Sequence, residues 1–363
     1  MKNRISDLLN LEVTGPIGSR MAVVTFHGLC ARLLRTYGHA FLENASGPSR
    51  LGSDFTIAAT SDSMRIVRSI VSEDPSRRGG SAEALWRDIQ KEKKRRGLAF
   101  NSQYDPISTL DSTQASHRDL QINRILPDMV NRYNQLLHAS NTLDFEDLIH
   151  FAITLMTQHP NIRNNTQNRF PHILVDEVQD TDMAQFELLR LLWQPTDGGL
   201  MEAPCKSSTA QQRSLFLVGD TNQSIYGWRD GSMGRGGVED MLQWLQQGQH
   251  QAGMQGSPPH SQQTGGPSTT FSLLLNYRSS PVIIRVAQTL LGSASGHSVY
   301  SVAPDHKQSV EYQPVRIYKA ANESEEGTFI CRAIADSRKS GASCAVLYRT
   351  NAQAAALEVR RCC

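Results

Sequence analysis

PHILVDEVQDT, residues 171–181, is the stretch that decides the predicted fold, because in it an apolar run leads directly into acidic residues. Ile173 to Val175 end the run, Asp176 and Glu177 follow at once, and Asp180 comes three positions later. Ligands of parallel sheets bind beyond the carboxyl ends of the strands. A carboxylate there suits Mg²⁺, and an adjacent one can accept a proton from an attacking water. A solvent-exposed strand end without chemistry is the alternative interpretation.

Other apolar runs typical of strands recur along the chain, namely MAVVTF, LFLVGD, FSLLLN, PVRIYKA and CAVLYRT. Segments with helical spacing lie between them, including FHGLCARLLRTYGHAFL, DMVNRYNQLLHA, DFEDLIHFAITLM and DMAQFELLRLLW. Strands that alternate with helices predict an α/β fold whose mostly parallel sheet is covered on both faces.

Composition limits the class of protein without naming its partner. The chain has 363 residues, and its 37 Lys and Arg against 35 Asp and Glu give a formal net charge of +2. A nucleic-acid surface would therefore have to be local. The six cysteines form no CxxC pair, which favours a reducing compartment. No apolar run approaches the roughly 20 residues that cross a bilayer, so we expect no membrane association.

Two kinds of segment interrupt the predicted alternation. Residues 63–139 are mainly helical in pattern, which predicts a helical subdomain inserted into the sheet domain. This region carries the run KEKKRR, residues 91–96, for which a solvated helix face is favoured over a DNA-facing patch. The stretches near 194–213 and 246–270 are rich in Gln, Gly, Ser and Pro and predict disordered insertions.

Further motifs follow the acidic stretch, and their order matches a known family. They are LFLVGDTNQSIYGWRDG (215–231), LLLNYRSSPVII (273–284) and AVLYRTNAQAAALE (345–358). With TFHGLCARLLR and LDFEDLI ahead of VDEVQDT, the chain resembles superfamily 1 DNA helicases of the UvrD/PcrA/Rep type. One short motif is weak support, but six in the same order make coincidence very unlikely.

The resemblance implies a fold and an activity. The fold is α/β, with a RecA-like parallel sheet as the first motor domain (1–62 and 140–270), an inserted helical subdomain (63–139) and the beginning of a second RecA-like motor domain (271–363). The activity is that of an ATP-dependent DNA helicase moving 3′ to 5′ on single-stranded DNA, in repair, recombination or replication. ATP and Mg²⁺ are the implied cofactors, and single-stranded DNA and junctions of single- and double-stranded DNA are the implied partners.

The resemblance also assigns roles around the nucleotide. Asp176 would bind Mg²⁺, Glu177 would be the general base, and Arg278 would stabilise charge on the transferring phosphoryl group. The implied nucleotide-binding residues are Gln223 at the terminal phosphate, Tyr277 on the adenine ring, and Gln179. Gln179 and Asp180 would link the nucleotide to the DNA site, although a helix cap is the competing role of Asp180.

A second set of residues would contact single-stranded DNA by the same resemblance. Aromatic rings stack on bases without reading their sequence, while hydroxyl, amide and guanidinium groups hold the backbone. The set comprises Thr25, Phe26, His27, Tyr226, Trp228, Arg349 and Asn351. Core packing is an equally good interpretation of Phe26 and Tyr226.

The chain also departs from the family pattern. The family usually has an aromatic residue at the position of Val178, and Gly-Ala where this chain has Asp230 and Gly231. Asp230 would place a negative charge near the DNA path. Members of the family hold the triphosphate with a glycine-rich loop ending in Gly-Lys-Ser/Thr, but no Gly-Lys dipeptide occurs in the 363 residues.

These departures lead to an expectation about the chain itself. MKNRISDLL at the beginning resembles the end of the motif that follows the phosphate loop, and the later motifs do not follow YRTNAQ. We therefore expect an internal helicase fragment lacking the Walker A loop and the C-terminal motifs, inactive alone. A DNA-binding or regulatory remnant and a metal nuclease using Asp176, Glu177 and Asp180 are the rivals. The low-complexity insertions suggest a eukaryotic chain, hence a nuclear or organellar location.

Overall fold

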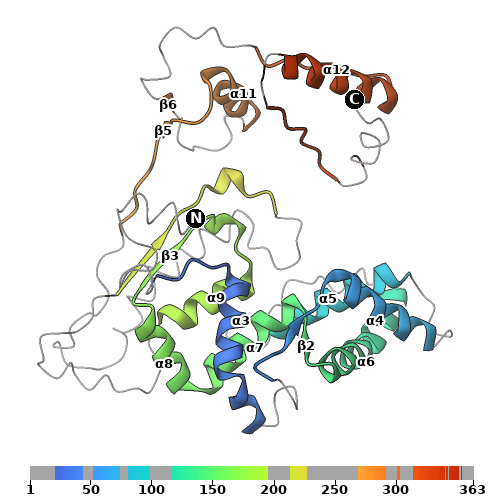
Figure 1. The fold of residues 1–363 in the computed structure, drawn as a ribbon, viewed down its shortest axis with the longest axis vertical. Helices are drawn as coiled ribbons and strands as arrows, with labels where there is room; N and C mark the ends of the chain where they lie inside the picture. The colour runs from blue at the N-terminus through green and yellow to red at the C-terminus, as the bar shows by residue number, and fades with distance from the viewer. Residues whose placement is uncertain are drawn as a thin grey trace, which may run out of the picture. The chain divides into compact units, whose positions relative to one another are not determined.

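The computed structural model divides the chain into two compact units, Met1–Ser268 and Thr269–Cys363. Figure 1 shows the course of the chain with its helix and strand labels. The structure describes residues 21–43, 52–73, 81–98, 117–194, 213–226, 269–291, 301–302, 314–339, 341, 343–350 and 353. The predicted insertions near 194–213 and 246–270 lie almost entirely outside these residues. The predicted domain boundaries stay a prediction.

The first unit is rich in helices, with short strands between them. Its elements are α3 (Phe26–Tyr37), η1 (Gly38–Glu43), β1 (Thr56–Ile57), α4 (Thr60–Glu73), α5 (Ala82–Leu98), α6 (His117–Ala139), β2 (Thr142–Leu143), α7 (Phe145–Gln158), α8 (Pro160–Arg169), β3 (His172–Val175), η4 (Val178–Asp180), α9 (Met183–Trp193), β4 (Ser214–Leu217) and η5 (Thr221–Gln223). The four segments with helical spacing coincide with α3, α6, α7 and α9, so these predictions are confirmed.

Side-chain caps fix where three of these helices begin. The Thr25 hydroxyl accepts a hydrogen bond from the Gly28 amide at the start of α3. Asp144 caps α7 in a capping box with Asp147, and Asp182 caps α9 by accepting from the amide of Gln185. Such caps satisfy backbone amides that have no partner inside the helix, at about 1 kcal/mol each.

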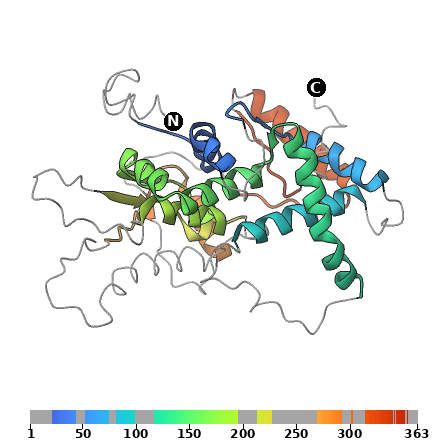
Figure 2. The ribbon, with the colours of Figure 1, turned by 90° about the horizontal axis from the view of Figure 1, so that it is seen from below.

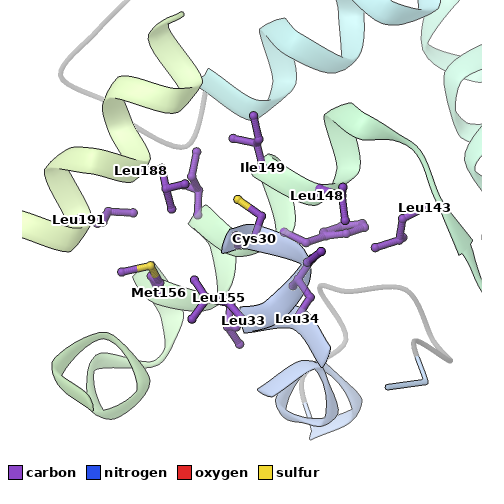
Figure 3. Close-up of a cluster of buried hydrophobic side chains, with 14 of the residues drawn as sticks. Cys30, Leu33, Leu34, Leu143, Leu148, Ile149, Leu155, Met156, Leu188 and Leu191 are labelled. Carbon is purple, nitrogen blue, oxygen red and sulfur yellow. The ribbon is translucent and has the colours of Figure 1, made fainter. Parts of the chain in front are cut away.

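Helix α7 lies at the centre of the main hydrophobic core. Its residues are apolar on nearly every face, and it packs against α3, α8 and α9. A helix that is apolar all round is stable only when it is surrounded by other elements. Figure 3 shows Cys30 and Leu34 of α3 facing Leu148 and Leu155 of α7, with Leu188 of α9 beside them.

A second, smaller core lies among α4, α5 and α6, which gather together in Figures 1 and 2. Tyr133 of α6 is fully buried there, packed with Val67 of α4 and Ile89 of α5. The parallel pair of β1 and β2 connects this group to the rest of the unit, with Thr56 opposite Thr142. The predicted solvated face of KEKKRR is wrong for Glu92 and Lys93, which are 8% and 7% exposed.

Strands β3 and β4 form a parallel pair in the register His172↔Ser214 to Val175↔Leu217. Parallel pairing places the two carboxyl ends at the same edge, so the acidic stretch and the VGDTNQ stretch leave the strands together. An α/β fold with parallel strand pairs is thus confirmed, whereas a RecA-like sheet stays a prediction.

The second unit contains β5 (Leu275–Asn276), α11 (Pro281–Leu291), β6 (Ser301–Val302) and α12 (Glu323–Lys339). Strands β5 and β6 are parallel. The strands predicted in PVRIYKA (314–320) and CAVLYRT (344–350) are wrong, as is the one in MAVVTF (21–26) of the first unit. An apolar run becomes a strand only where a neighbour completes its hydrogen bonds, and the described residues offer these segments none. Among the described residues, no helix is long and apolar enough to cross a membrane.

The burial of α7 in the main core can be tested with one type of substitution at a buried and at an exposed position. Leu155 is fully buried in α7, whereas Leu174 on β3 is 75% exposed. We expect Leu155→Ala to lower the free energy of unfolding by about 2–5 kcal/mol because it leaves a cavity. Leu174→Ala, the matched control, should change it by less than about 0.5 kcal/mol. Urea denaturation of the two variants measures the difference, and equal losses would contradict the placement of α7 in the core.

Candidate active site

The two acids after β3 leave the strand through an unusual backbone turn. Glu177 has φ 53° and ψ 44°, in the left-handed region that residues other than glycine adopt rarely. Its amide donates to Asp176 Oδ1 at 3.0 Å. Both side chains are exposed. The turn thus ends the strand and presents two carboxylates at its carboxyl end.

The side chain of Gln179 joins this turn to the end of β4. Gln179 is 2% exposed, and its amide nitrogen donates to Glu177 Oε2 at 2.6 Å. Its amide oxygen accepts from the backbone amide of Asp220 at 3.0 Å. The hydroxyl of Ser224 also donates to the Gln179 carbonyl at 3.3 Å. A buried amide with both of its polar atoms bonded has one stable orientation.

The backbone approaches closely at the same place. The Val178 amide donates to the Val218 carbonyl at 3.0 Å, which extends the contact between the two strands beyond their ladder. A Cβ at Gly219 would lie 2.5 Å from Gln179 Oε1 and 2.7 Å from Val178 Cγ1. Only glycine fits there without a shift. Val178 itself is 5% exposed and packs with Val175 and Leu189, so valine fills the position where the family usually has an aromatic residue.

The carboxylate of Asp220 continues this hydrogen-bond network to Gln223. Asp220 Oδ1 accepts from the Asn222 amide, and Oδ2 accepts from Gln223 Nε2, both at 2.9 Å. The result is a continuous chain from the Glu177 carboxylate through Gln179 and Asp220 to Gln223. Gln223 is exposed at its far end. Two motifs separated by more than forty residues are thus one hydrogen-bonded unit.

The acids fit a magnesium ion that is shared with phosphate oxygens. Mg²⁺ in nucleotide sites takes one or two carboxylates and completes its shell with water and phosphate. The exposed carboxylate of Asp176 meets that need. The metal-nuclease alternative requires Asp176, Glu177 and Asp180 together, but the part of the chain that is described holds no group of three potential ligands. A capping role of Asp180 is also wrong, because Asp182 caps α9.

The described residues of the predicted DNA set differ in how far they are buried. Phe26 is partly buried and packs against two core clusters, so packing is part of its role. Thr25 is exposed and caps α3. Tyr226 is half-buried, and Arg349 is exposed with its amide bonded to Gln353 Oε1. Trp228 and Asn351 lie outside the described residues.

His27 lies beside an aromatic residue that the sequence did not single out. The rings of His27 and Phe145 meet edge to face, with their centroids 5.2 Å apart. Burial lowers the pKa of His27, which keeps its ring neutral near pH 7. Phe145 is 53% exposed in the first turn of α7, directly after the cap Asp144. A large aromatic residue immediately after a helix cap is the sequence signal that could have identified it.

In the second unit, a tight turn presents Tyr277 and Arg278. The Asn276 side chain accepts from the amides of Arg278 and Ser279, at 3.0 and 2.8 Å. Tyr277 is 62% exposed, and Arg278 is exposed as well. Both predicted nucleotide contacts of this unit are therefore accessible at the end of β5.

Comparisons with known proteins agree with this arrangement of motifs. The family model of the UvrD/REP helicase N-terminal domain matches residues 1–235, and that of the UvrD-like helicase C-terminal domain matches residues 271–360. The chain belongs to the UvrD-like helicase family.

Individual relatives match at modest identity over nearly the whole chain. DNA helicase II of Salmonella typhimurium is 28% identical over 364 residues, and that of Escherichia coli is 27% identical. ATP-dependent DNA helicase PcrA of Staphylococcus aureus is 25% identical over 369 residues. The matches cover 99% of this chain but 40–41% of these relatives, so the chain spans about two fifths of their length.

The prediction of a nuclear location is wrong. The relatives named above are bacterial proteins, and bacteria have no nucleus. Low-complexity insertions were the only basis for that prediction, and composition of this kind does not identify a compartment.

The acid next to Phe145 gives a pH test of the packing around α7. Burial raises the pKa of Glu146 from 4.5 to about 7, with Lys94 opposing the shift and Asp144 and Asp182 adding to it. The folded protein then holds a proton that the unfolded chain releases, so stability falls as pH rises from 4.5 to about 7. We expect Glu146→Gln to raise the free energy of unfolding by up to about 3 kcal/mol above that range and hardly at all below it.

Urea denaturation across this pH range measures the effect. Glu326→Gln on α12 makes the same charge change at an exposed position and serves as the control. A stability difference for Glu146→Gln that does not vary with pH would contradict the burial of Glu146.

Proposed function

We propose that this chain forms the nucleotide- and DNA-handling region of a UvrD/PcrA-type helicase, which hydrolyses ATP to move 3′ to 5′ on single-stranded DNA. The proposed setting is DNA repair, recombination or replication, at junctions of single- and double-stranded DNA. The observation that carries the proposal is the hydrogen-bonded chain from Glu177 through Gln179 and Asp220 to Gln223. It links a candidate base to a candidate phosphate sensor.

The residues at the strand ends have distinct tasks in this proposal. Bound Mg²⁺ would neutralise charge on the phosphates of ATP, and Asp176 would hold it. Glu177 would take the proton of the attacking water. Its Oε2 is bonded to Gln179, so the hydrogen bond orients the carboxylate and leaves Oε1 for the water.

Gln223 would respond to the terminal phosphate. Its amide nitrogen donates to Asp220 in the present structure and can donate to a phosphate oxygen instead. Such an exchange would alter the segment between Gln223 and Tyr226, and thereby the proposed DNA contact of Tyr226. In the second unit, Arg278 would stabilise charge on the transferring phosphoryl group and Tyr277 would stack on adenine.

The DNA contacts would be a stacking surface with polar groups around it. His27 and Phe145 supply aromatic rings at the first turns of α3 and α7, and Thr25 supplies a hydroxyl. Aromatic stacking tolerates every base, as a motor that must move along any sequence requires. Phe26, Tyr226, Trp228, Arg349 and Asn351 complete the proposed set.

One observation favours a second function, that of a DNA-binding or regulatory module without hydrolysis. The sequence contains no Gly-Lys dipeptide, and the family's phosphate loop depends on that lysine to hold the β and γ phosphates. ATP turnover by the polypeptide, with and without single-stranded DNA, discriminates between the two functions.

The role of Glu177 is tested with the phosphate loop supplied. The chain alone should turn over ATP negligibly, and a chimaera with a Gly-Lys-Ser/Thr loop joined ahead of Met1 should show DNA-stimulated turnover. In the chimaera, Glu177→Gln should reduce turnover by about 100-fold or more, because a positioned base is lost, while ATP binding persists. Glu73→Gln, at an exposed acid on α4, is the control. Turnover within a few fold of the parent would show that Glu177 is not the base.

The stacking role of Phe145 is tested against a matched aromatic residue. Phe145 and Phe216 are 53% and 52% exposed, but only Phe145 lies beside His27. Phe145→Ala should weaken the binding of oligo-dT by about 1–3 kcal/mol, with similar losses for other base sequences. Phe216→Ala should leave affinity unchanged. Fluorescence anisotropy measures the oligo-dT affinity of both variants. Equal losses of affinity would show that Phe145 has no specific role in DNA binding.

A further inference from the structure

A buried lysine connects α5 to the first turn of α7. Lys93 Nζ lies 2.7 Å from Asp144 Oδ2 and 2.7 Å from Asp147 Oδ1. The three residues are 7%, 3% and 2% exposed, in that order. The Tyr133 hydroxyl is 3.1 Å from Asp144 Oδ2, and His138 Nε2 is 3.1 Å from Asp147 Oδ2. A buried charge is tolerated only with such partners.

The same carboxylates form the cap of α7. Asp144 Oδ1 accepts from the Asp147 amide, and Asp147 Oδ2 accepts from the Asp144 amide. Each acid therefore uses one oxygen for the cap and the other for Lys93. Two buried carboxylates this close repel each other, and the ammonium group between them offsets that repulsion. Burial lowers the pKa of Lys93, but the two carboxylates outweigh it and the net shift is upward, so the amine stays charged.

The first turn of α7 is also where the structure brings aromatic residues together. Phe145 lies between the two capping acids in the sequence, and its ring meets that of His27. The position of Phe145 thus depends on the cap, and the cap depends on the ammonium group from α5. Lys93 lies on α5 of the α4–α6 group, so its ion pairs connect the smaller hydrophobic core to the main one.

We propose that Lys93 is a positioning residue for the DNA-contacting surface: its double ion pair holds the first turn of α7 so that Phe145 packs against His27. The inference rests on the proposed DNA role of these two rings. Lys93 does not itself reach DNA, because both of its carboxylate partners are buried with it.

The experiment compares three variants of the full chain. Lys93→Met removes the ammonium group and keeps a side chain of similar length. Lys93→Met combined with Asp144→Asn also removes one carboxylate and keeps a good capping residue, in case the single variant does not fold. Ile89→Ala, the control, removes buried volume from α5 one turn earlier without touching the ion pairs.

Two measurements are made on each variant that folds. The ring-current shift of the His27 protons, observed by NMR, reports the edge-to-face contact with Phe145 and needs no DNA. Oligo-dT affinity per folded molecule, measured at several salt concentrations, reports the DNA surface. Denaturation curves supply the folded fraction.

The Lys93 variants should lose the ring-current shift and bind oligo-dT about three- to tenfold more weakly, as expected of a residue that acts on a site without touching it. Ile89→Ala should keep both. The dependence of affinity on salt should not change, whereas loss of a phosphate contact would reduce the slope by about 0.7.

Other results overturn the proposal. An unchanged ring-current shift would show that Lys93 does not position Phe145, and a reduced salt slope would make Lys93 a direct phosphate contact. Unfolding of both Lys93 variants would make it a determinant of folding instead. If the parent chain does not bind oligo-dT, the proposed function fails, and the ring-current shift alone still decides whether Lys93 positions the aromatic pair.

Discussion

The buried side chain of Gln179 is the constraint on which the candidate active site depends. Its amide bonds to the Glu177 carboxylate on one side and to the Asp220 backbone on the other, so the ends of β3 and β4 cannot move independently. The absence of a Cβ at Gly219 permits this close approach. In a motor, chemistry at the phosphate must alter contacts elsewhere. A hydrogen-bonded chain that runs from Glu177 through Gln179 and ends on the exposed Gln223 is a physical means of transmitting such a change.

The proposed DNA-contacting surface depends on a second buried polar group, the side chain of Lys93. The capping acids of α7 would repel each other without Lys93, and the turn between them carries Phe145. A buried ion pair contributes little net stability but is costly to break, which suits a part that must hold one geometry. Both proposed functional surfaces of the first unit thus depend on buried polar contacts, while the apolar cores around α7 and Tyr133 supply the stability.

Much of this arrangement was predictable from the sequence, and the exceptions have physical reasons. The helices and the acidic end of β3 follow from local spacing and caps, and the family follows from six ordered motifs. The strands predicted in PVRIYKA and CAVLYRT were wrong because pairing depends on a distant partner that an apolar run does not encode. The charged run KEKKRR predicts a solvated helix face, but Lys93 is buried. Composition alone cannot show that Asp144 and Asp147 lie opposite Lys93 in the fold. The bridging role of Asp220 was also missed, since it uses a backbone amide.

The strand ends that carry Glu177 and Gln223 form one hydrogen-bonded unit through Gln179. Amide hydrogen exchange at Asp220 measures this link, because that amide donates to the buried Gln179 oxygen at 3.0 Å. We expect slow exchange at the Asp220 amide and fast exchange there in Gln179→Leu. The Val218 amide, which donates to the Val175 carbonyl in the strand pair, should stay protected in both proteins. Exchange at Asp220 as fast as in an open loop, or unaffected by Gln179→Leu, would show that Gln179 does not join the two strand ends.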